Sequence, residues 1–293
     1  MAGRSPAVLA ENIFFGEGPR WHEGRLWFSD FHARAVISVS PTGDARREFT
    51  IDDQPSGLGW MPDGSMLIVS MRKRQLLRRK TDGGITVHAD LSTIAGYHCN
   101  DMVVDASGGA YVGNFGFDLD AELTARGTTS VLADHPTAKL AYVAPDGTAK
   151  VAAEGMHFPN GSVITPDGKT LIVGETLGGV LTAFDIGADG KLSNRCVWAP
   201  TTPRIPDGIS LDASGAIWIA NPLAPECVRI AQGGKVLEVI DTVMPCFACT
   251  LGGEDGKTLF MLTAPTSNGH EAAAEPKGKL IAVKVEVSRA GRP

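Results

Sequence analysis

The chain lacks the features of a nucleic-acid-binding, membrane or helical protein. Its 293 residues carry a formal net charge of −6 with no extended basic face, which argues against a nucleic-acid partner. No run approaches the roughly 18 apolar residues of a membrane span. No segment has a long helical period, and aromatic residues make up only 6% of the chain. The 35 glycines instead favour a soluble, loop-rich β protein.

Cysteine is also scarce. The five cysteines are an odd number without the spacing of a disulfide framework, and the start of the chain lacks an apolar signal core. We therefore expect a cytoplasmic protein. Cys246 and Cys249 have the spacing of a redox or zinc pair, but no second pair or nearby histidine completes a zinc set.

What the chain does contain is a repeat of a glycine followed by a short apolar strand. The leading glycines are 40, 44, 60, 47 and 41 residues apart, close to the period of a four-stranded propeller blade. A second set of strand-like runs keeps the same period, and turn pairs such as Asp-Gly follow many of them. The six copies are residues 24–30, 64–71, 108–115, 168–175, 215–221 and 256–263. The sequence predicts an all-β fold, a six-bladed β-propeller with four antiparallel strands per blade, as a single domain over residues 1–293.

Two stretches lie outside this regular repeat. Residues 116–138 lengthen the third interval and form an insertion between two strands of the third blade. The insertion could form a helical turn or two and cover a site at one end of the propeller, or it could be a mobile surface loop. To close the ring, we expect a strand at residues 13–15, or the repeat at 20–30, to pair with residues 278–288.

A polar residue precedes most of the repeated glycines at a constant distance. Counting back eight residues, or seven in the first blade, reaches Glu17, Ser56, Asn100, Asn160, Asp207 and Ala248. Positions in the same register lie at the same radius, so these side chains should converge near one mouth of the central channel. The two carboxylates and two carboxamides among them would be costly to bury without a positive ion. They suit Ca²⁺, Mg²⁺ or Mn²⁺, and possible further occupants are Fe²⁺ and Zn²⁺. Alternatively, the Asn-Gly and Asp-Gly pairs are ordinary turns.

Around these residues the chain resembles the senescence marker protein/gluconolactonase family, the regucalcin-like six-bladed propellers. The motifs are GEGPRW, NDMVVDASGGAYVGN, PNGSVITPDGKTLIVGET, LTAFDIGADGKLSNRCVW and PDGISLDASGAIWIAN, at residues 16–21, 100–114, 159–176, 181–198 and 206–221. The resemblance implies that Glu17, Asn160 and Asp207 hold one divalent cation, and that Asn100 completes the shell or contacts substrate. It also implies hydrolysis of a lactone, with Asp207 as the candidate general base.

The chain departs from the family beside Asn100. Many sugar-lactone members have an arginine two residues before this asparagine, where the present chain has His98. A histidine lacks the multi-donor fork of a guanidinium, so recognition of a polyhydroxylated sugar is in question. Apolar segments at 113–117, 156–159 and 246–249 also point to a less polar lactone or ester. The expected substrate contacts are His98, Asn100, Phe115, His157 and Glu175.

The sequence therefore predicts a divalent-metal-dependent hydrolase that opens a sugar-type or less polar lactone. Three alternatives remain: a metal-dependent ester or organophosphate hydrolase, a non-catalytic calcium-binding propeller, and a propeller that serves as a protein-binding scaffold. The expected partner is a small molecule, with neither nucleic acid nor membrane. The expected assembly is a monomer or a small homo-oligomer.

Overall fold

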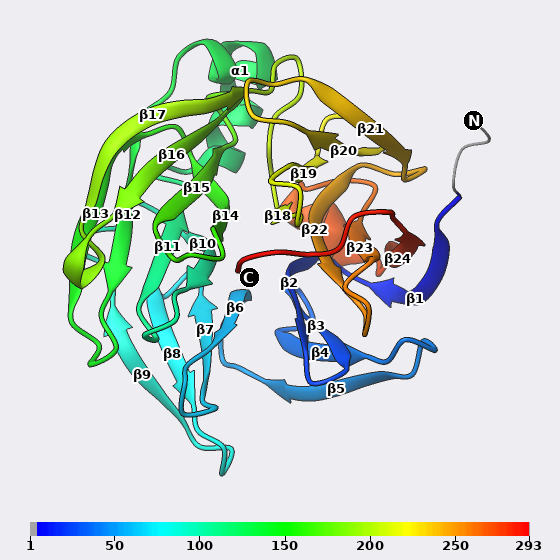
Figure 1. The fold of residues 1–293 in the computed structure, drawn as a ribbon, viewed down its shortest axis with the longest axis horizontal. Helices are drawn as coiled ribbons and strands as arrows, with labels where there is room; N and C mark the ends of the chain where they lie inside the picture. The colour runs from blue at the N-terminus through cyan, green and yellow to red at the C-terminus, as the bar shows by residue number, and fades with distance from the viewer. Residues whose placement is uncertain (1–4, 293) are drawn as a thin grey trace.

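Six four-stranded antiparallel sheets surround a central axis in a computed structural model that describes residues 5–292 (Figure 1). The inner strands β2, β6, β10, β14, β18 and β22 contact one another around this axis. The predicted six-bladed β-propeller with four antiparallel strands per blade is confirmed.

Five blades each use four consecutive strands, ordered from the axis outward. The first has β2 (Gly16–His22), β3 (Arg25–Asp30), β4 (Ala35–Val39) and β5 (Ala45–Thr50). The second has β6 (Pro55–Trp60), β7 (Met66–Ser70), β8 (Gln75–Arg79) and β9 (Ile85–Asp90). The third has β10 (Cys99–Val104), β11 (Ala110–Asn114), β12 (Ala138–Val143) and β13 (Ala149–Met156). The fourth has β14 (Pro159–Ile164), β15 (Thr170–Glu175), β16 (Val180–Ile186) and β17 (Leu192–Pro200), with a 3-10 turn, η1, at Ala188–Gly190. The fifth has β18 (Ile209–Leu211), β19 (Ile217–Asn221), β20 (Glu226–Ile230) and β21 (Val236–Asp241).

The sixth blade joins the two ends of the chain. It contains β22 (Cys246–Gly252), β23 (Thr258–Thr263) and β24 (Gly278–Lys284), and its outermost strand is β1 (Ala7–Ile13). Strand β1 pairs with β24, and Ile13 lies opposite Gly278. The prediction that an N-terminal strand pairs with residues 278–288 is therefore confirmed, and the strand begins earlier than expected. The alternative of residues 20–30 is wrong, because they form the first blade.

The C-terminal segment crosses the central channel after β24 (Figure 1). Arg292 bridges to Ile164 at the end of β14, and Arg289 bridges to Asp212 just after β18. The segment thus lies at the end of the channel where the inner strands finish. The C-terminal segment does not cover the opposite end, where the inner strands begin, and a site can lie there.

Two helices interrupt the sheets. The insertion of the third blade forms α1 (Leu119–Ala133), which is longer than the one or two turns expected. Its first turn is capped by Asp118, whose side chain accepts from the Ala121 N–H at 3.1 Å, and it is kinked at Gly127. The short α2 (Gly269–Ala274) lies between β23 and β24. No helix within residues 5–292 is long and apolar enough to cross a membrane.

Candidate functional site

The polar residues that share one register converge where the inner strands begin. A chain of hydrogen bonds links them: Ser56 Oγ donates to Asn100 Oδ1 at 3.2 Å, and Asn100 Nδ2 donates to Asn160 Oδ1 at 2.9 Å. Asn160 Nδ2 then donates to Asp207 Oδ1 at 2.5 Å. Glu17 lines the same cavity as Asn100, Asn160 and Asp207. We call these last four residues the base of the cavity.

The glycines that follow Asn160 and Asp207 have a packing role. The Asn160-Gly161 pair lies within β14, and the Asp207 N–H bonds to the Ala220 carbonyl of the neighbouring strand at 3.1 Å. A Cβ on Gly161 would lie 2.5 Å from the Asp207 carbonyl oxygen. Glycine therefore lets two inner strands approach closely enough for their polar side chains to meet. Neither pair is the ordinary hairpin turn that the sequence left as an alternative.

The two carboxylates of the base are almost fully buried. Glu17 is 4% exposed and Asp207 is 7% exposed. Burial raises the pKa of the Glu17 carboxyl well above its usual value, and the charges of Asp207 and Asp101 raise it further. Burial likewise raises the pKa of Asp207, against the lowering effect of the Asn160 hydrogen bond. Without a cation, this pair of carboxylates is electrostatically unfavourable.

Asp101 is a third buried carboxylate next to the base, but it already has a cationic partner. Arg20 Nη2 lies 2.8 Å from Asp101 Oδ1, and both side chains are 6% exposed. The same guanidinium donates to the carbonyls of Leu58 and Met102, which lie on the inner strands of the second and third blades. Arg20 therefore neutralises Asp101 and ties three inner strands together below the base. Sequence analysis did not identify this pair.

The base fits a hard divalent cation. Within residues 5–292, Glu17 accepts one hydrogen bond, from the adjacent Gly18 N–H at 3.3 Å, and Asp207 accepts one, from Asn160. A carboxylate can accept about four, so both retain lone pairs facing the cavity. No group of three or more His, Cys, Asp and Glu side chains suited to a metal occurs in this described part. A site with two carboxylates and two amide oxygens instead matches the oxygen preference of Ca²⁺, Mg²⁺ or Mn²⁺.

The cavity above the base has a volume of about 640 Å³. Residues two positions before the base register line it: Phe15, Gln54, His98, Phe158 and Ile205. We call these five residues the second ring. Side chains alternate in direction along a strand, so a step of two keeps them on the channel side. The count back from each repeated glycine that identified the base would, if extended by two residues, also have identified the second ring.

Three of the five predicted substrate contacts line this cavity, namely His98, Asn100 and Phe115. The His98 ring stacks on Tyr97 with ring centres 4.0 Å apart, and it meets the edge of Phe115. Burial, with a smaller effect of the nearby Arg72 guanidinium, lowers the pKa of His98. Phe115 stacks on Phe158 with centres 4.3 Å apart. Both His98 and Phe115 line the cavity, as Asn100 does.

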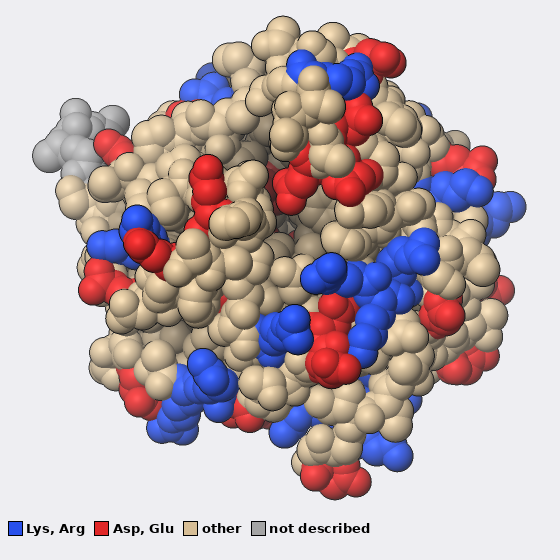
Figure 2. All heavy atoms as spheres, turned by 180° about the vertical axis from the view of Figure 1, so that it is seen from behind, with Lys and Arg blue, Asp and Glu red and all other residues tan. Residues whose placement is uncertain are grey.

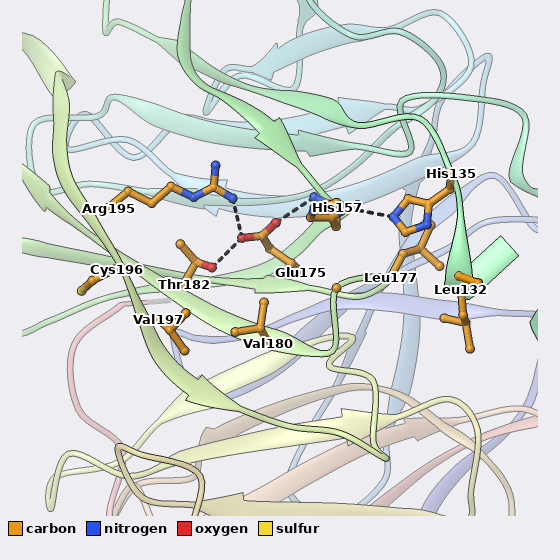
Figure 3. Close-up of a pocket in the computed structure, with 12 residues that line it drawn as sticks. Leu132, His135, His157, Glu175, Leu177, Val180, Thr182, Arg195, Cys196 and Val197 are labelled. Carbon is orange, nitrogen blue, oxygen red and sulfur yellow. Dashed lines mark hydrogen bonds and ion pairs between the residues drawn. The ribbon is translucent and has the colours of Figure 1, made fainter.

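The structure places the other two predicted contacts elsewhere. His157 and Glu175 line a separate pocket of about 570 Å³ between α1 and the outer part of the fourth blade (Figure 3). Glu175 accepts from the His157 N–H at 2.7 Å, from Thr182 Oγ1 at 2.5 Å and from Arg195 Nη2 at 3.0 Å. Glu175 pairs with Pro159, one residue from Asn160, so its side chain faces away from the channel. Neither His157 nor Glu175 is among the described residues that line the central cavity.

The face opposite the C-terminal segment is hollowed near its centre (Figure 2). Acidic side chains gather above the hollow in this view, and Lys and Arg side chains gather below it around a further acidic group. The cavity lining includes Asp118 and Asp120 from the start of α1, and Arg72 from the second blade. The lining at this end of the channel therefore carries side chains of both charges.

Comparison with known proteins gives consistent results. Residues 15–265 match the family described as SMP-30/Gluconolactonase/LRE-like region. Pentonolactonase XacC of Haloferax volcanii is 27% identical, over 98% of this chain and 95% of the relative. The 6-deoxy-6-sulfogluconolactonase of Pseudomonas putida is 23% identical, over 99% of this chain and 96% of the relative. A calcium-binding protein, regucalcin, from Agrobacterium tumefaciens has a similar fold, with a TM-score of 0.80, 22% identity and coverage of 100% of this chain and 99% of that one.

Proposed function

Because the chain belongs to the SMP-30/Gluconolactonase/LRE-like family, we propose that it is a divalent-metal-dependent hydrolase that opens a lactone ring. The observation that carries the proposal is the base of the cavity, where two under-bonded carboxylates and two carboxamides meet. The names of the two curated relatives support a lactone as the substrate. The calcium-binding description of the regucalcin supports a divalent cation.

We assign a role to each residue of the base. Glu17, Asn160 and Asp207 hold the cation through oxygen atoms, and Asn100 completes the shell or binds the substrate carbonyl. The Asn100 to Asn160 to Asp207 hydrogen-bond chain fixes the orientation of these side chains. A bound divalent cation would polarise the lactone carbonyl and lower the pKa of a nearby water.

Asp207 acts as the general base in this proposal. Its carboxylate retains free lone pairs facing the cavity, since among the described residues only Asn160 donates to it. As the water oxygen bonds to the carbonyl carbon, Asp207 takes the water proton. The ring C–O bond then breaks, and the proton passes from Asp207 to the ring oxygen. The product is the open hydroxy acid.

The decisive experiment follows acid release from a lactone after chelation, and again after adding Ca²⁺, Mg²⁺, Mn²⁺, Zn²⁺ or Fe²⁺. We expect chelation to abolish turnover and at least one ion to restore it. An aryl ester and a phosphotriester are assayed in parallel. Stoichiometric metal binding with no hydrolysis would favour a non-catalytic calcium-binding protein. A faster reaction with the ester or phosphotriester would favour the other hydrolase classes.

The role of Asp207 is tested separately with Asp207→Asn. This variant keeps the shape of the side chain but cannot accept the proton, so kcat should fall at least about a hundredfold. Metal content is measured on the same sample to separate lost binding from lost proton transfer. The matched control is Asp167→Asn, in an exposed hairpin turn of the neighbouring fourth blade, and it should leave kcat unchanged. Near-normal turnover by Asp207→Asn would refute this role.

A further inference from the structure

Apolar side chains dominate the cavity immediately above the base. In the second ring, Phe15, Phe158 and Ile205 are apolar, and only Gln54 and His98 are polar. Any group attached to a ring held at the base must pass this level. A hydroxyl facing Phe15, Phe158 or Ile205 would lose its water without gaining a partner.

Phe158 holds its place against a backbone cost. Its φ is +57°, a left-handed conformation that is rare for a bulky residue. The conformation is fixed by the bond from the Thr176 N–H to the Phe158 carbonyl at 3.0 Å and by the stack on Phe115. Strained backbone of this kind tends to be kept where a side chain must take a set position at a site. The Phe158 side chain is held in the wall of the cavity.

The roof of the cavity, which we define as helix α1, is mainly apolar, with Asp120 and Thr128 as its polar lining residues. Leu119 and Leu123 line the cavity from its first half, and Val131 and Leu132 line it from its second half. Leu119, Leu123 and Leu132 are only half-buried although they pack on the Phe158 cluster. The helix therefore leaves apolar surface facing an open cavity of about 640 Å³. Cavities of about 300–1,000 Å³ with mainly apolar walls are typical sites for ligands of drug size.

We propose that the lactone ring carries an apolar substituent, an alkyl chain or an aryl group, that lies in the cavity against the Phe115–Phe158 stack and α1. This inference rests on the proposed function and names the substrate class of the same site. The ring carbonyl lies at the base, and the substituent extends past the second ring to Leu119 and Leu123. Burying each methylene there strengthens binding, and hydroxyl groups along this path would weaken it.

The test is a series of γ-lactones of increasing alkyl chain length, starting from γ-butyrolactone, compared with gluconolactone on the metal-loaded enzyme. We expect kcat/KM to rise about three- to fourfold with each added methylene until the chain fills the cavity. Gluconolactone should be a poorer substrate than the longer alkyl lactones. A flat series, or a higher kcat/KM for gluconolactone, would overturn the inference.

A pair of variants localises the effect to the roof. Leu123→Gln places an amide where the chain should lie, so kcat/KM should fall most for the longest lactone and the dependence on chain length should flatten. Ala125→Gln is the matched control, because Ala125 is on the same helix, exposed, and does not line the cavity. It should leave the whole series unchanged. Equal effects of the two variants would contradict this placement of the substituent.

A binding measurement separates this inference from the proposed function. Pentylcyclopentanone has the ring carbonyl and the chain but no ester bond, so it can bind without turnover. We expect it to raise the melting temperature of the protein and to inhibit lactone hydrolysis, both less strongly in Leu123→Gln. If it binds in this way while no lactone is hydrolysed, the proposed function fails and the apolar ligand class stands. If sugar lactones are hydrolysed and it does not bind, the function stands and the inference fails.

Discussion

The base and the roof of the cavity are built in opposite ways. The base uses one register of the six-fold repeat, so Glu17, Asn100, Asn160 and Asp207 come from four blades and meet through symmetry. The roof is a single insertion, α1, between β11 and β12 of the third blade. The base is buried and cross-braced by the Arg20–Asp101 pair, whereas most of α1 is exposed. The repeated part of this propeller thus brings the polar side chains of the base together, and the insertion adds further apolar surface over the same cavity.

The largest expected effect comes from breaking the ring that supports the base. Deleting residues 279–293 removes most of β24, which pairs with both β23 and β1, together with the segment that bridges to the ends of two inner strands. We expect the protein to lose its cooperative unfolding transition, measured by circular dichroism on heating. A shorter deletion of residues 289–293 keeps β24 and should retain the transition. A protein without residues 279–293 that melts unchanged would contradict this closure.

The same contrast explains what the sequence could predict. The repeat predicted the blades, the two recognised strands of each, and the convergence of the base, because equal spacing implies an equal place in a propeller. For residues 116–138 it left open a helical turn or two or a mobile loop, since α1 has no clear apolar period and its start is marked mainly by the capping Asp118. His157 lies three residues before Asn160 rather than two. Side-chain alternation therefore puts it outside the cavity.

The second largest loss of stability is expected from removing the Arg20 guanidinium, which pairs with Asp101 below the base. Arg20→Met leaves the buried Asp101 carboxylate without a cationic partner, next to two other carboxylates, with the Met102 N–H still donating to it. We expect the free energy of unfolding to fall by about 3–5 kcal/mol, measured with urea. Arg46→Met is the control, because Arg46 pairs with Asp44 at the surface and is 63% exposed. Its loss should stay below about 1 kcal/mol. Similar losses in both variants would show that Arg20 does not brace the base.

A methyl group added between two inner strands tests whether their spacing sets the geometry of the base, and its effect on stability should be smaller. In Gly161→Ala the new Cβ would meet the backbone of Asp207 and Ile209 at 2.5 and 2.6 Å. The obstructing atoms are main chain and cannot rotate away, so the loss should reach about 3 kcal/mol. The Asn160–Asp207 hydrogen bond should lengthen, and calorimetry should detect weaker metal binding. Unchanged metal affinity would mean that the spacing of these strands does not set the geometry of the base.

The corresponding change in the roof should have the smallest effect. Gly127 kinks α1 with φ +75° and ψ 159°, and a Cβ there would meet nothing within 4 Å. Gly127→Ala therefore strains only the backbone, and the free energy of unfolding should fall by about 1 kcal/mol. Val131 and Leu132 follow the kink and line the cavity, so kcat/KM for the longer alkyl lactones should change while metal affinity stays constant. A change in metal affinity as large as that of Gly161→Ala would show that the conformation of α1 affects the geometry of the base. The base and the roof would then not be independent of each other.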